Sequence, residues 1–363
     1  MQAADPGGAA PATTSAVVVN YNGGDKVVRV IEALVAHAPE IDRIIVADNG
    51  STDASLPTIR ERFPAVEILE LGANLGLPNA RNAGLRRATG RWALLLDADI
   101  YVTPGCVRAL LDAAARYRAA VVCPRIILVP DGSTVQCDGA EPHFVGTLAL
   151  LNPDVPRSLP PVPAGPVGGL IGAAMLVDRQ KVLEAGGFNE LYFFYFEDLE
   201  FSLRMRLLGH EVVRAPAAIV EHERGQGHAG LSFRGKGSYP PKRAYLGMRN
   251  RLLTMALCYR GRTIALLLPV LVAYELATLA FALSRGFLRE WWAGWRWIVA
   301  NRAAIGRERR ALQARRVRPD RELLGAQPLP LASGVVGSQV LERAVRVFDW
   351  SLAAYWRLVA RWT

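Results

Sequence analysis

The chain has 363 residues, of which 51% are hydrophobic and 21% are charged, which excludes an intrinsically disordered protein. This length suits one large domain with an appended region. The net charge of +10 is uneven, because residues 1–233 hold 20 Lys and Arg against 26 Asp and Glu, whereas residues 234–363 hold 23 against 7. Such a basic half favours an anionic partner, either nucleic acid or a membrane face.

Residues 1–15 are rich in Ala, Pro, Gly and Thr, with neither the basic nor the apolar segment of a signal peptide. We therefore expect a loose tail over this stretch. No CxxC spacing or zinc-binding pattern is formed by the four cysteines, which are Cys106, Cys123, Cys137 and Cys258. A reducing cytosol fits this pattern.

From Ala16 the chain alternates strand and helix patterns. Apolar, β-branched runs predict strands at 16–20, 43–48, 66–71, 91–97 and 120–124. Helices are predicted between them, the first with Val27, Val28, Ile31, Leu34 and Val35 on one side, others across 78–88 and from Pro104. This order predicts an α/β fold with a mostly parallel, doubly wound sheet flanked by helices. Right-handed crossovers then bring Asn20, Asp48 and Asp97 to one edge of the sheet.

Two carboxylates, Asp97 and Asp99, directly follow the buried run 94–96. Ligands bind at the carboxyl ends of strands in open α/β sheets. Paired carboxylates there suit a divalent cation that takes its other oxygens from water and substrate phosphates. The alternative is that an Asp here only caps the next helix.

Asp48 could accept a hydrogen bond from a base or a ribose hydroxyl, and Arg81 could reach a phosphate or a pyrimidine carbonyl. Taken alone, Asp48 could equally be a cap and Arg81 a solvated surface charge. The sequence contains neither GxGxxG nor GxxxxGK[ST], which argues against dinucleotide binding and P-loop chemistry. A metal-bound nucleotide diphosphate remains as the natural ligand.

Four segments, in their order and spacing, resemble the family-two glycosyltransferases with the GT-A fold: VVVNYNGG, IIVADNGSTD, NLGLPNARNAGL and LLLDAD. Three later segments resemble the acceptor half of the same family: GGLIGAAMLVDR (168–179), GGFNELYFFYFEDLEFSLRMRLLGHEV (186–212) and AIVEH (218–222). The similarity covers roughly residues 15–230 and is greatest to the bacterial rhamnosyltransferase-like group that builds surface polysaccharides. NLGLPNARNAG departs from the Gly- and Asn-rich run common in that group, which leaves the donor sugar open.

The resemblance implies a Rossmann-like GT-A domain over 16–233 that transfers a sugar, with inversion, from a nucleotide-diphosphate donor to a hydroxyl. It makes Asp48 the base- or ribose-binding acid and Arg81 the arginine of the nucleotide pocket, and Asn20 at the same sheet edge is a further substrate-binding candidate. Asp97 and Asp99 match the metal and ribose aspartates, and with His222 they are the candidate metal residues, with Mg²⁺ or Mn²⁺ as the ion.

In the acceptor half, the resemblance makes Asp198 the general base, Glu197 a substrate-binding neighbour and His222 a residue near the diphosphate and metal. The aromatic run 192–196 precedes this pair and could exclude water or stack on a sugar. From Glu197 the pattern becomes helical. The alternative interpretation is that these acidic residues only interact with the helix dipole in the first turn.

His222 is the stronger candidate for a site histidine because it follows an apolar run, whereas His228 is a weaker candidate. Arg224, Arg234 and Lys236 lie in or beside a Gly-rich stretch. That stretch could be a lid over a leaving diphosphate or only a linker.

The basic region 234–363 contains an apolar segment, 264–283, long enough to span a membrane as a helix. Glu275 within it would cost about 2.5–3.5 kcal/mol at mid-depth, and both flanks are basic. We therefore favour helices lying in the cytoplasmic leaflet, with 339–362 as one more amphipathic helix, over a true span. A nucleic-acid partner is the less favoured interpretation, because this region contains an aliphatic run and a cluster of tryptophans: Trp291, Trp292, Trp295 and Trp297.

The expected function is a metal-dependent, inverting glycosyltransferase at the cytoplasmic face of the cell membrane. Its partners would be a nucleotide-diphosphate sugar, a saccharide acceptor that is lipid-linked, and the anionic membrane surface. Two alternatives remain: a membrane-bound nucleotidyltransferase and a non-catalytic adaptor that binds nucleotide sugars.

Overall fold

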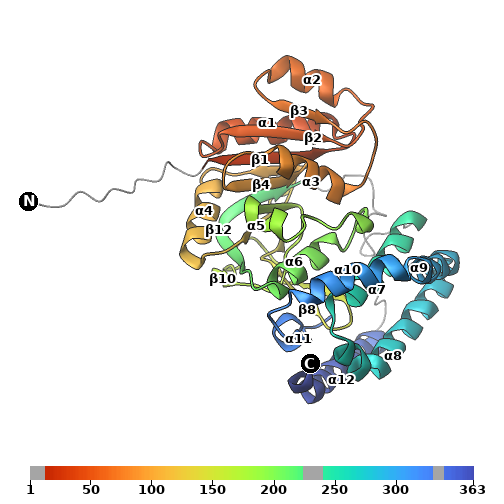
Figure 1. Ribbon diagram of the computed structural model, residues 1–363. Helices are drawn as coiled ribbons and strands as arrows, with labels where there is room; N and C mark the ends of the chain where they lie inside the picture. Colours follow the sequence, from red (N-terminus) through yellow and green to blue (C-terminus); the bar gives the residue numbers. More distant parts are fainter. Residues whose placement is uncertain (1–12, 224–239, 330–338) are drawn as a thin grey trace, which may run out of the picture.

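The computed structural model describes residues 13–223, 240–329 and 339–363. Its centre is a ten-stranded sheet in the order β10-β12-β6-β11-β4-β1-β2-β3, with β5 beside β12 and β7 beside β6 (Figure 1). The strands are β1 (Thr14–Asn20), β2 (Arg43–Asp48), β3 (Glu67–Glu70), β4 (Trp92–Asp97), β5 (Ile100–Val102), β6 (Val121–Leu128), β7 (Thr134–Cys137), β10 (Gly165–Pro166), β11 (Ala174–Asp178) and β12 (Val212–His222). A separate hairpin joins β8 (Ala140–His143) to β9 (Thr147–Leu150).

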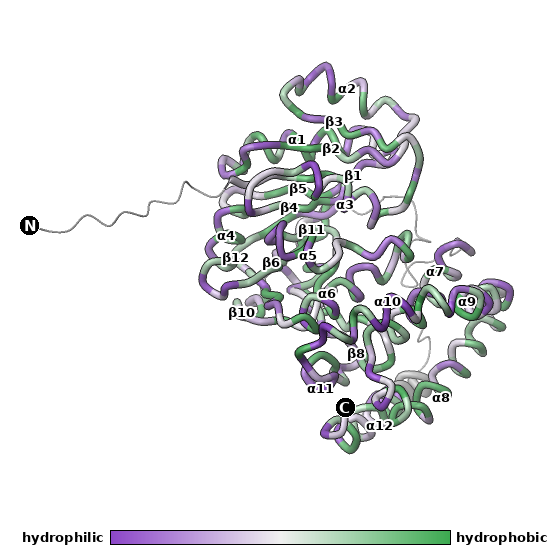
Figure 2. Tube along the Cα trace, in the orientation of Figure 1, coloured by the Kyte–Doolittle hydropathy of each residue, from purple (hydrophilic) through white to green (hydrophobic). Residues whose placement is uncertain are grey.

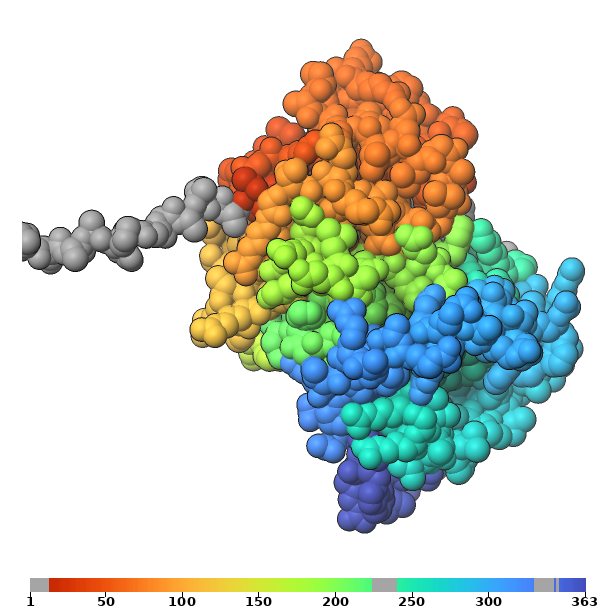
Figure 3. All heavy atoms as spheres, viewed as in Figure 1, coloured from red at the N-terminus to blue at the C-terminus, as the bar shows by residue number. Residues whose placement is uncertain are grey.

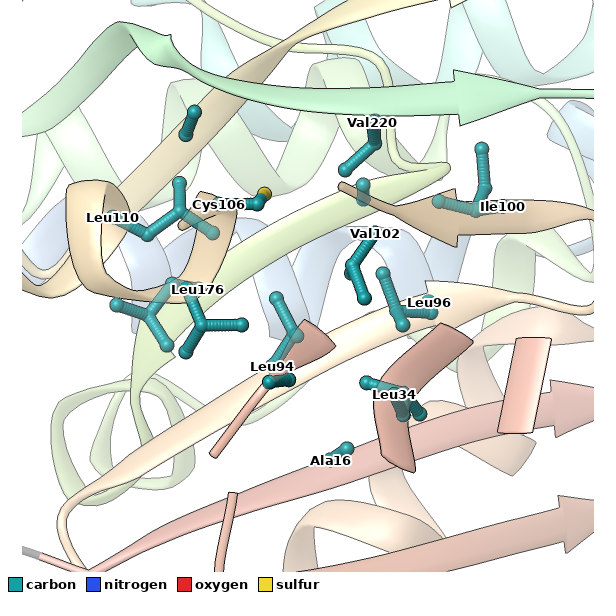
Figure 4. Close-up of a cluster of buried hydrophobic side chains, with 14 of the residues drawn as sticks. Ala16, Leu34, Leu94, Leu96, Ile100, Val102, Cys106, Leu110, Leu176 and Val220 are labelled. Carbon is teal, nitrogen blue, oxygen red and sulfur yellow. The ribbon is translucent and has the colours of Figure 1, made fainter. Parts of the chain in front are cut away.

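The helices of this part are α1 (Gly24–His37), α2 (Ser55–Arg62), α3 (Leu77–Arg87), α4 (Cys106–Tyr117), α5 (Arg179–Glu184) and α6 (Glu197–Leu207), with a 3₁₀ turn, η1 (Glu190–Tyr192). Alternation along β1 directs Ala16 and Val18 into one core cluster and Val17 and Val19 into another. The first cluster includes residues of α1 and α4, as Figure 4 shows, and the second includes residues of α3 and α6. Helices therefore cover both faces of the sheet.

These elements confirm the predicted α/β fold with a mostly parallel sheet. β1, β2, β3 and β4 pair in parallel, as do β6 and β12, whereas β11 runs antiparallel to both β4 and β6. The predicted strand at 16–20 begins earlier, at Thr14, and the short strand β5 was not predicted. Val35 is 65% exposed, because the buried stripe of α1 extends toward Val30 instead.

The C-terminal part is helical and contains α7 (Pro241–Cys258), α8 (Gly261–Arg285), α9 (Leu288–Ala300), α10 (Arg302–Ala314), α11 (Asp320–Leu323), α12 (Gln339–Val359) and η2 (Ala360–Trp362). These helices form a layer at the end of the molecule opposite α2 and β3 (Figures 1 and 3). Leu253, Leu257 and Leu267 of this layer share a core cluster with Leu199 and Leu203 of α6.

Among the described residues, α8 is the helix long and apolar enough to cross a membrane, with a mean hydropathy of 2.1 over its most apolar window. Figure 2 shows α8 and much of α12 as largely apolar. Glu275 within α8 is not left unpaired: it forms an ion pair with Arg251 and accepts hydrogen bonds from the indoles of Trp291 (2.7 Å) and Trp295 (2.9 Å). Glu275 therefore ties α8 to α7 and α9.

Candidate functional site

The carboxyl ends of three parallel strands meet at one edge of the sheet. Asn20 at the end of β1 is in register with Asp48 at the end of β2, and Val19 is in register with Asp97 at the end of β4. The predicted juxtaposition is confirmed. A cleft of about 450 Å³ opens at this edge, a volume within the usual range for small-molecule sites.

Asp97 and Asp99 line this cleft together with the aromatic residues Phe193 and Phe194. Five polar residues of the lining were not predicted as site residues from the sequence: Tyr21, Asn22, Lys26, Asn49 and Asn74. Their only signal in the sequence was a position in or next to a turn after a predicted strand, which many surface residues share.

Asp48 lies behind the lining and is 2% exposed. One carboxylate oxygen accepts a hydrogen bond from Asn20 (2.8 Å), and the other accepts from the backbone N–H groups of Gly50 (3.1 Å) and Ser51 (2.9 Å). Asn20 also donates to the hydroxyls of Ser51 and Ser55. The expectation that Asp48 itself touches a base or ribose does not fit this geometry, because its oxygens are already used to shape the loop that presents Asn49.

The residues after β4 make a tight turn into β5, which pairs antiparallel with the end of β12. This pairing sets His222 opposite Ile100 and brings its Nε2 within 3.4 Å of Asp99 Oδ1. His222 Nδ1 lies 2.6 Å from the side-chain oxygen of Gln136, which can only accept, so Nδ1 carries the proton. Nε2 is then the ring nitrogen that can offer a lone pair to a ligand shared with the Asp99 carboxylate.

A lone pair and a carboxylate at this separation are a donor set that fits a divalent cation, and the Gln136 contact is the kind of hydrogen bond that orients a ligating His. Within residues 13–223, 240–329 and 339–363, no three His, Cys, Asp or Glu side chains converge closely enough to enclose an ion. An ion at this site would therefore complete its shell with water and ligand oxygens, as Mg²⁺ commonly does.

Arg81 is 1% exposed and is not the solvated surface charge that the sequence left open. Its guanidinium donates to Asp97 Oδ1 (3.0 Å), to the carbonyl of Gly172 (2.7 Å) and to Glu197 Oε1 (3.3 Å). The expected contact of Arg81 with a phosphate or pyrimidine does not fit this burial. Arg81 instead joins the end of β4 to the start of α6.

Asp198 lies in the first turn of α6, beside this cluster. Its carboxylate accepts from the backbone N–H groups of Gly172 (3.1 Å) and Leu199 (2.8 Å). A Cβ atom at Gly172 would lie 2.9 Å from the Arg81 guanidinium and 3.3 Å from Asp198 Cβ, so only glycine lets both side chains approach. Asp97, Glu197 and Asp198, predicted to face one site, are brought together here.

The loop before Asp198 has a strained backbone, with positive φ at Phe193 (62°), Tyr195 (66°) and Phe196 (65°). Asn250 of α7 holds it through hydrogen bonds from its side-chain amide to the carbonyls of Tyr192 (3.0 Å), Phe194 (2.9 Å) and Tyr195 (2.7 Å). Sequence reasoning missed Asn250, because it lies far along the chain in a segment read only for charge and hydropathy.

Three carboxyls of the cluster have raised pKa values. Burial, together with the nearby charge of Asp198, raises the pKa of Glu197 to about 8, although Arg81 opposes the shift. Burial also raises the pKa values of Asp97 and Asp198; Arg81 opposes the first shift and two backbone N–H groups oppose the second. Glu197 Oε2 has no hydrogen-bond partner among the described residues. Glu197 therefore holds a proton at neutral pH.

His228, Arg224, Arg234 and Lys236, the weaker candidates of the sequence analysis, lie outside the described residues.

Replacing the buried Arg81 by Met removes the partner shared by Asp97, Glu197 and the carbonyl of Gly172. We expect the free energy of unfolding to fall by about 3–5 kcal/mol, the typical cost of breaking a buried pair by removing one partner. Urea denaturation measures this change. Arg86→Met, an exposed change on the same helix, should stay within about 0.5 kcal/mol of the wild type. An R81M protein as stable as R86M would contradict the analysis.

Glu197 also makes stability depend on pH. The folded protein keeps this proton up to about pH 8, whereas the unfolded chain loses it near pH 4.3. Because the folded state then binds more protons across this window, stability falls as pH rises through it. Glu197→Gln stays neutral, so this part of the decline disappears when urea unfolding is measured from about pH 5 to 8. Glu61→Gln, exposed on α2, is the control; identical pH profiles for E197Q and wild type would refute the assignment.

Comparison with known proteins matches the sequence to one family. The family model "Glycosyl transferase family 2" matches residues 15–141, and "Glycosyl transferase family group 2" matches residues 92–306. The N-acetylglucosaminyl-diphospho-decaprenol L-rhamnosyltransferase of Mycobacterium tuberculosis is 33% identical over 231 residues, covering 57% of this chain and 75% of that protein. ExoO, a succinoglycan biosynthesis protein of Rhizobium meliloti, is 33% identical over a shorter stretch, 33% of this chain and 35% of that protein.

Solved structures show the same fold. GalNAc-T7 with UDP, GalNAc and Mn²⁺ superposes with a TM-score of 0.58 and 17% identity over 81% of this chain, which spans 57% of that structure. Residues 1–349 of Staphylococcus aureus TarS with UDP-GlcNAc superpose with a TM-score of 0.53 and 16% identity, covering 95% of this chain and 92% of that one. The chain belongs to glycosyltransferase family 2 and is a glycosyltransferase with the GT-A fold.

Proposed function

We propose that this glycosyltransferase moves the sugar of a nucleotide-diphosphate donor to a hydroxyl of a saccharide acceptor in one inverting displacement. The shared role of Gly172 carries the proposal. Its carbonyl accepts from Arg81, which also binds Asp97, while its N–H donates to Asp198. A carboxylate that lines the cleft and a carboxylate suited to accept a proton therefore belong to one rigid cluster.

In the displacement, the acceptor oxygen bonds to the anomeric carbon while the bond from that carbon to the diphosphate oxygen breaks. Asp198 takes the hydroxyl proton of the acceptor, a contribution of typically ~10²–10⁴-fold. The N–H groups of Gly172 and Leu199 hold its carboxylate in place and favour the ionised form that a base needs. The neutral Glu197 beside it adds no second charge.

For the donor, we assign direct contacts to Asp97 and to the other polar residues of the lining. Asn20 and Asp48 act by shaping the loop that carries Asn49, and Arg81 and Glu197 act by fixing Asp97 and Asp198. This division follows burial, since none of these four positioning side chains is more than 4% exposed.

We assign a divalent cation, Mg²⁺ or Mn²⁺, to Asp99 and His222, with Asp97 beside them. When bound, it neutralises the charge that grows on the leaving diphosphate. Support comes from the neighbouring His222 nitrogen and Asp99 carboxylate, and from the Mn²⁺ in the GalNAc-T7 structure of similar fold.

For the acceptor, we propose a lipid-linked saccharide used in cell-surface polysaccharide synthesis at the cytoplasmic face of the membrane. The M. tuberculosis relative is named for a lipid-diphosphate-linked N-acetylglucosamine. Exposed leucines and valines, Leu268, Val272, Leu276 and Leu283, form one face of α8, and Tyr355 joins α12 to α8. Exposed arginines on α12 and η2, which are Arg343, Arg346, Arg357 and Arg361, suit anionic headgroups. We propose that the described helices after residue 240 form the membrane-associated part.

Asp198→Asn tests the reaction. The amide cannot take the proton, so we expect transfer to fall by about 10²–10⁴-fold while nucleotide binding stays within twofold of wild type. Transfer is followed by product formation with a panel of nucleotide sugars, and proton NMR of the product reports the anomeric configuration. Retention at the anomeric carbon, or full transfer by D198N, would overturn the proposed displacement. Asp112→Asn, exposed on α4, is the control.

Removal of metal tests the assigned ion. Chelation should abolish transfer, and added Mn²⁺ or Mg²⁺ should restore it. His222→Ala should weaken Mn²⁺ binding, measured by calorimetry in the presence of UDP, by roughly 10-fold or more, whereas His37→Ala should not. Undiminished transfer after exhaustive chelation would show that no ion is needed.

Membrane binding is tested by charges placed on the exposed face of α8. Leu276→Glu combined with Leu283→Glu should lower affinity for phosphatidylglycerol-containing vesicles about tenfold or more, because each buried Leu contributes roughly 1.5–3 kcal/mol. Val35→Glu, an equally exposed change on α1, should leave binding unchanged. Co-sedimentation measures the affinity, and equal binding of all three proteins would contradict a role for α8.

A further inference from the structure

Two cations lie against the aromatic wall of the cleft without being part of its lining. Lys242 and Arg243 occupy the first turn of α7. Lys242 Nζ is 4.2 Å from the ring centroid of Phe193, and the Arg243 guanidinium is 5.8 Å from that of Phe194 and 4.9 Å from that of Tyr195. Because Phe193 and Phe194 line the cleft, these charges lie at its border.

Among the described residues, this border of the cleft is positively charged. α7 contains no Asp or Glu, Lys242 is exposed, and Lys242 has no acidic partner within ion-pair distance among the described residues. An aromatic ring does not neutralise an ammonium group that stacks on it, so Lys242 keeps its charge available to a ligand. This part of the surface is therefore suited to an anion.

The surroundings define the kind of anion. On one side, the aromatic loop leads within a few residues to Asp198, where a sugar hydroxyl would react. On the other side, α7 packs against α9, since Arg249 lies 4.5 Å from the ring centroid of Trp297, and through Arg251 it is tied to α8 with its exposed apolar face. The order of contacts, from Asp198 through the aromatic loop and α7 to α8, suits a ligand with a sugar at one end, a negative charge between, and an apolar chain at the other end.

The donor diphosphate is not the better candidate for these cations. The lining of the donor cleft already holds one cation, Lys26, and two carboxylates, Asp97 and Asp99, that suit a divalent ion for the donor diphosphate, whereas Lys242 and Arg243 do not line it. We infer that Lys242 and Arg243 bind the diphosphate of a lipid-diphosphate saccharide acceptor, an inference that rests on the proposed function. They would place the acceptor sugar over Asp198 by holding the group that joins it to the lipid.

Direct binding tests this site without the transfer reaction. Calorimetry of the full-length protein with farnesyl diphosphate, farnesol and inorganic diphosphate should give the tightest binding for farnesyl diphosphate. Lys242→Gln combined with Arg243→Gln should weaken it about tenfold or more, since hydrogen bonds to charged groups are worth about 1.5–3 kcal/mol. Arg116→Gln is the matched control, because Arg116 is also an exposed cation over an aromatic ring, that of Tyr117.

The outcomes separate the site from the overall function. Unchanged binding of farnesyl diphosphate by the double variant, or a loss of UDP binding instead, would overturn the assignment. In transfer assays, the double variant should raise KM for prenyl-diphosphate N-acetylglucosamine, with kcat and the KM for octyl N-acetylglucosaminide near wild type. A wild-type protein that transfers sugar to neither acceptor would argue against the proposed function, while the calorimetric result would still stand.

Discussion

Arg81 holds its guanidinium, 1% exposed, between carboxylates from opposite halves of the chain, and the site depends on this buried cluster. Burying ions costs several kcal/mol for each, so their geometry must be satisfied by close partners. Arg81 meets this requirement with Asp97, Glu197 and the carbonyl of Gly172, which fixes the end of β4 against the start of α6. Asp198 is held by the N–H of the same glycine, so its position follows from that of the arginine.

The helical layer after residue 240 forms part of the molecular surface and also supports the candidate site. Asn250 holds three carbonyls of a loop whose backbone is strained at Phe193, Tyr195 and Phe196, and strain of this kind persists only where the surroundings enforce it. Phe193 and Phe194 line the cleft, so α7 shapes it from outside the sheet domain. The family match over residues 92–306 likewise extends through α7, α8 and α9. The layer that we propose to contact the membrane therefore also shapes the cleft.

Much of the fold could be predicted, because its signals are local. Apolar runs bounded by turn residues marked β1, β2 and β4, and their parallel order brought Asn20, Asp48 and Asp97 to one edge. The burial of Asp48 and Arg81 could not be predicted, since burial depends on which residues pack over a side chain. Both looked like ligand-binding residues and both are buried, Arg81 against Asp97 and Glu197, and Asp48 against Asn20 and its own loop. Asn250 gave no signal, because its three acceptors are backbone carbonyls, which no sequence pattern encodes.

By itself, the sequence determined the α/β class, the family, the acidic turn after β4 and the apolar helix in a basic region, since each is written in short segments of fixed spacing. Only the tertiary structure decided which of these residues face the cleft, which charges neutralise one another in the interior, and that Glu275 is satisfied by Arg251 and two tryptophans. The physical reason is that pairing and exposure are properties of contacts between residues separated by tens to hundreds of positions. Local pattern places a carboxylate at the end of a strand, but only packing determines whether it meets solvent, a substrate or an arginine.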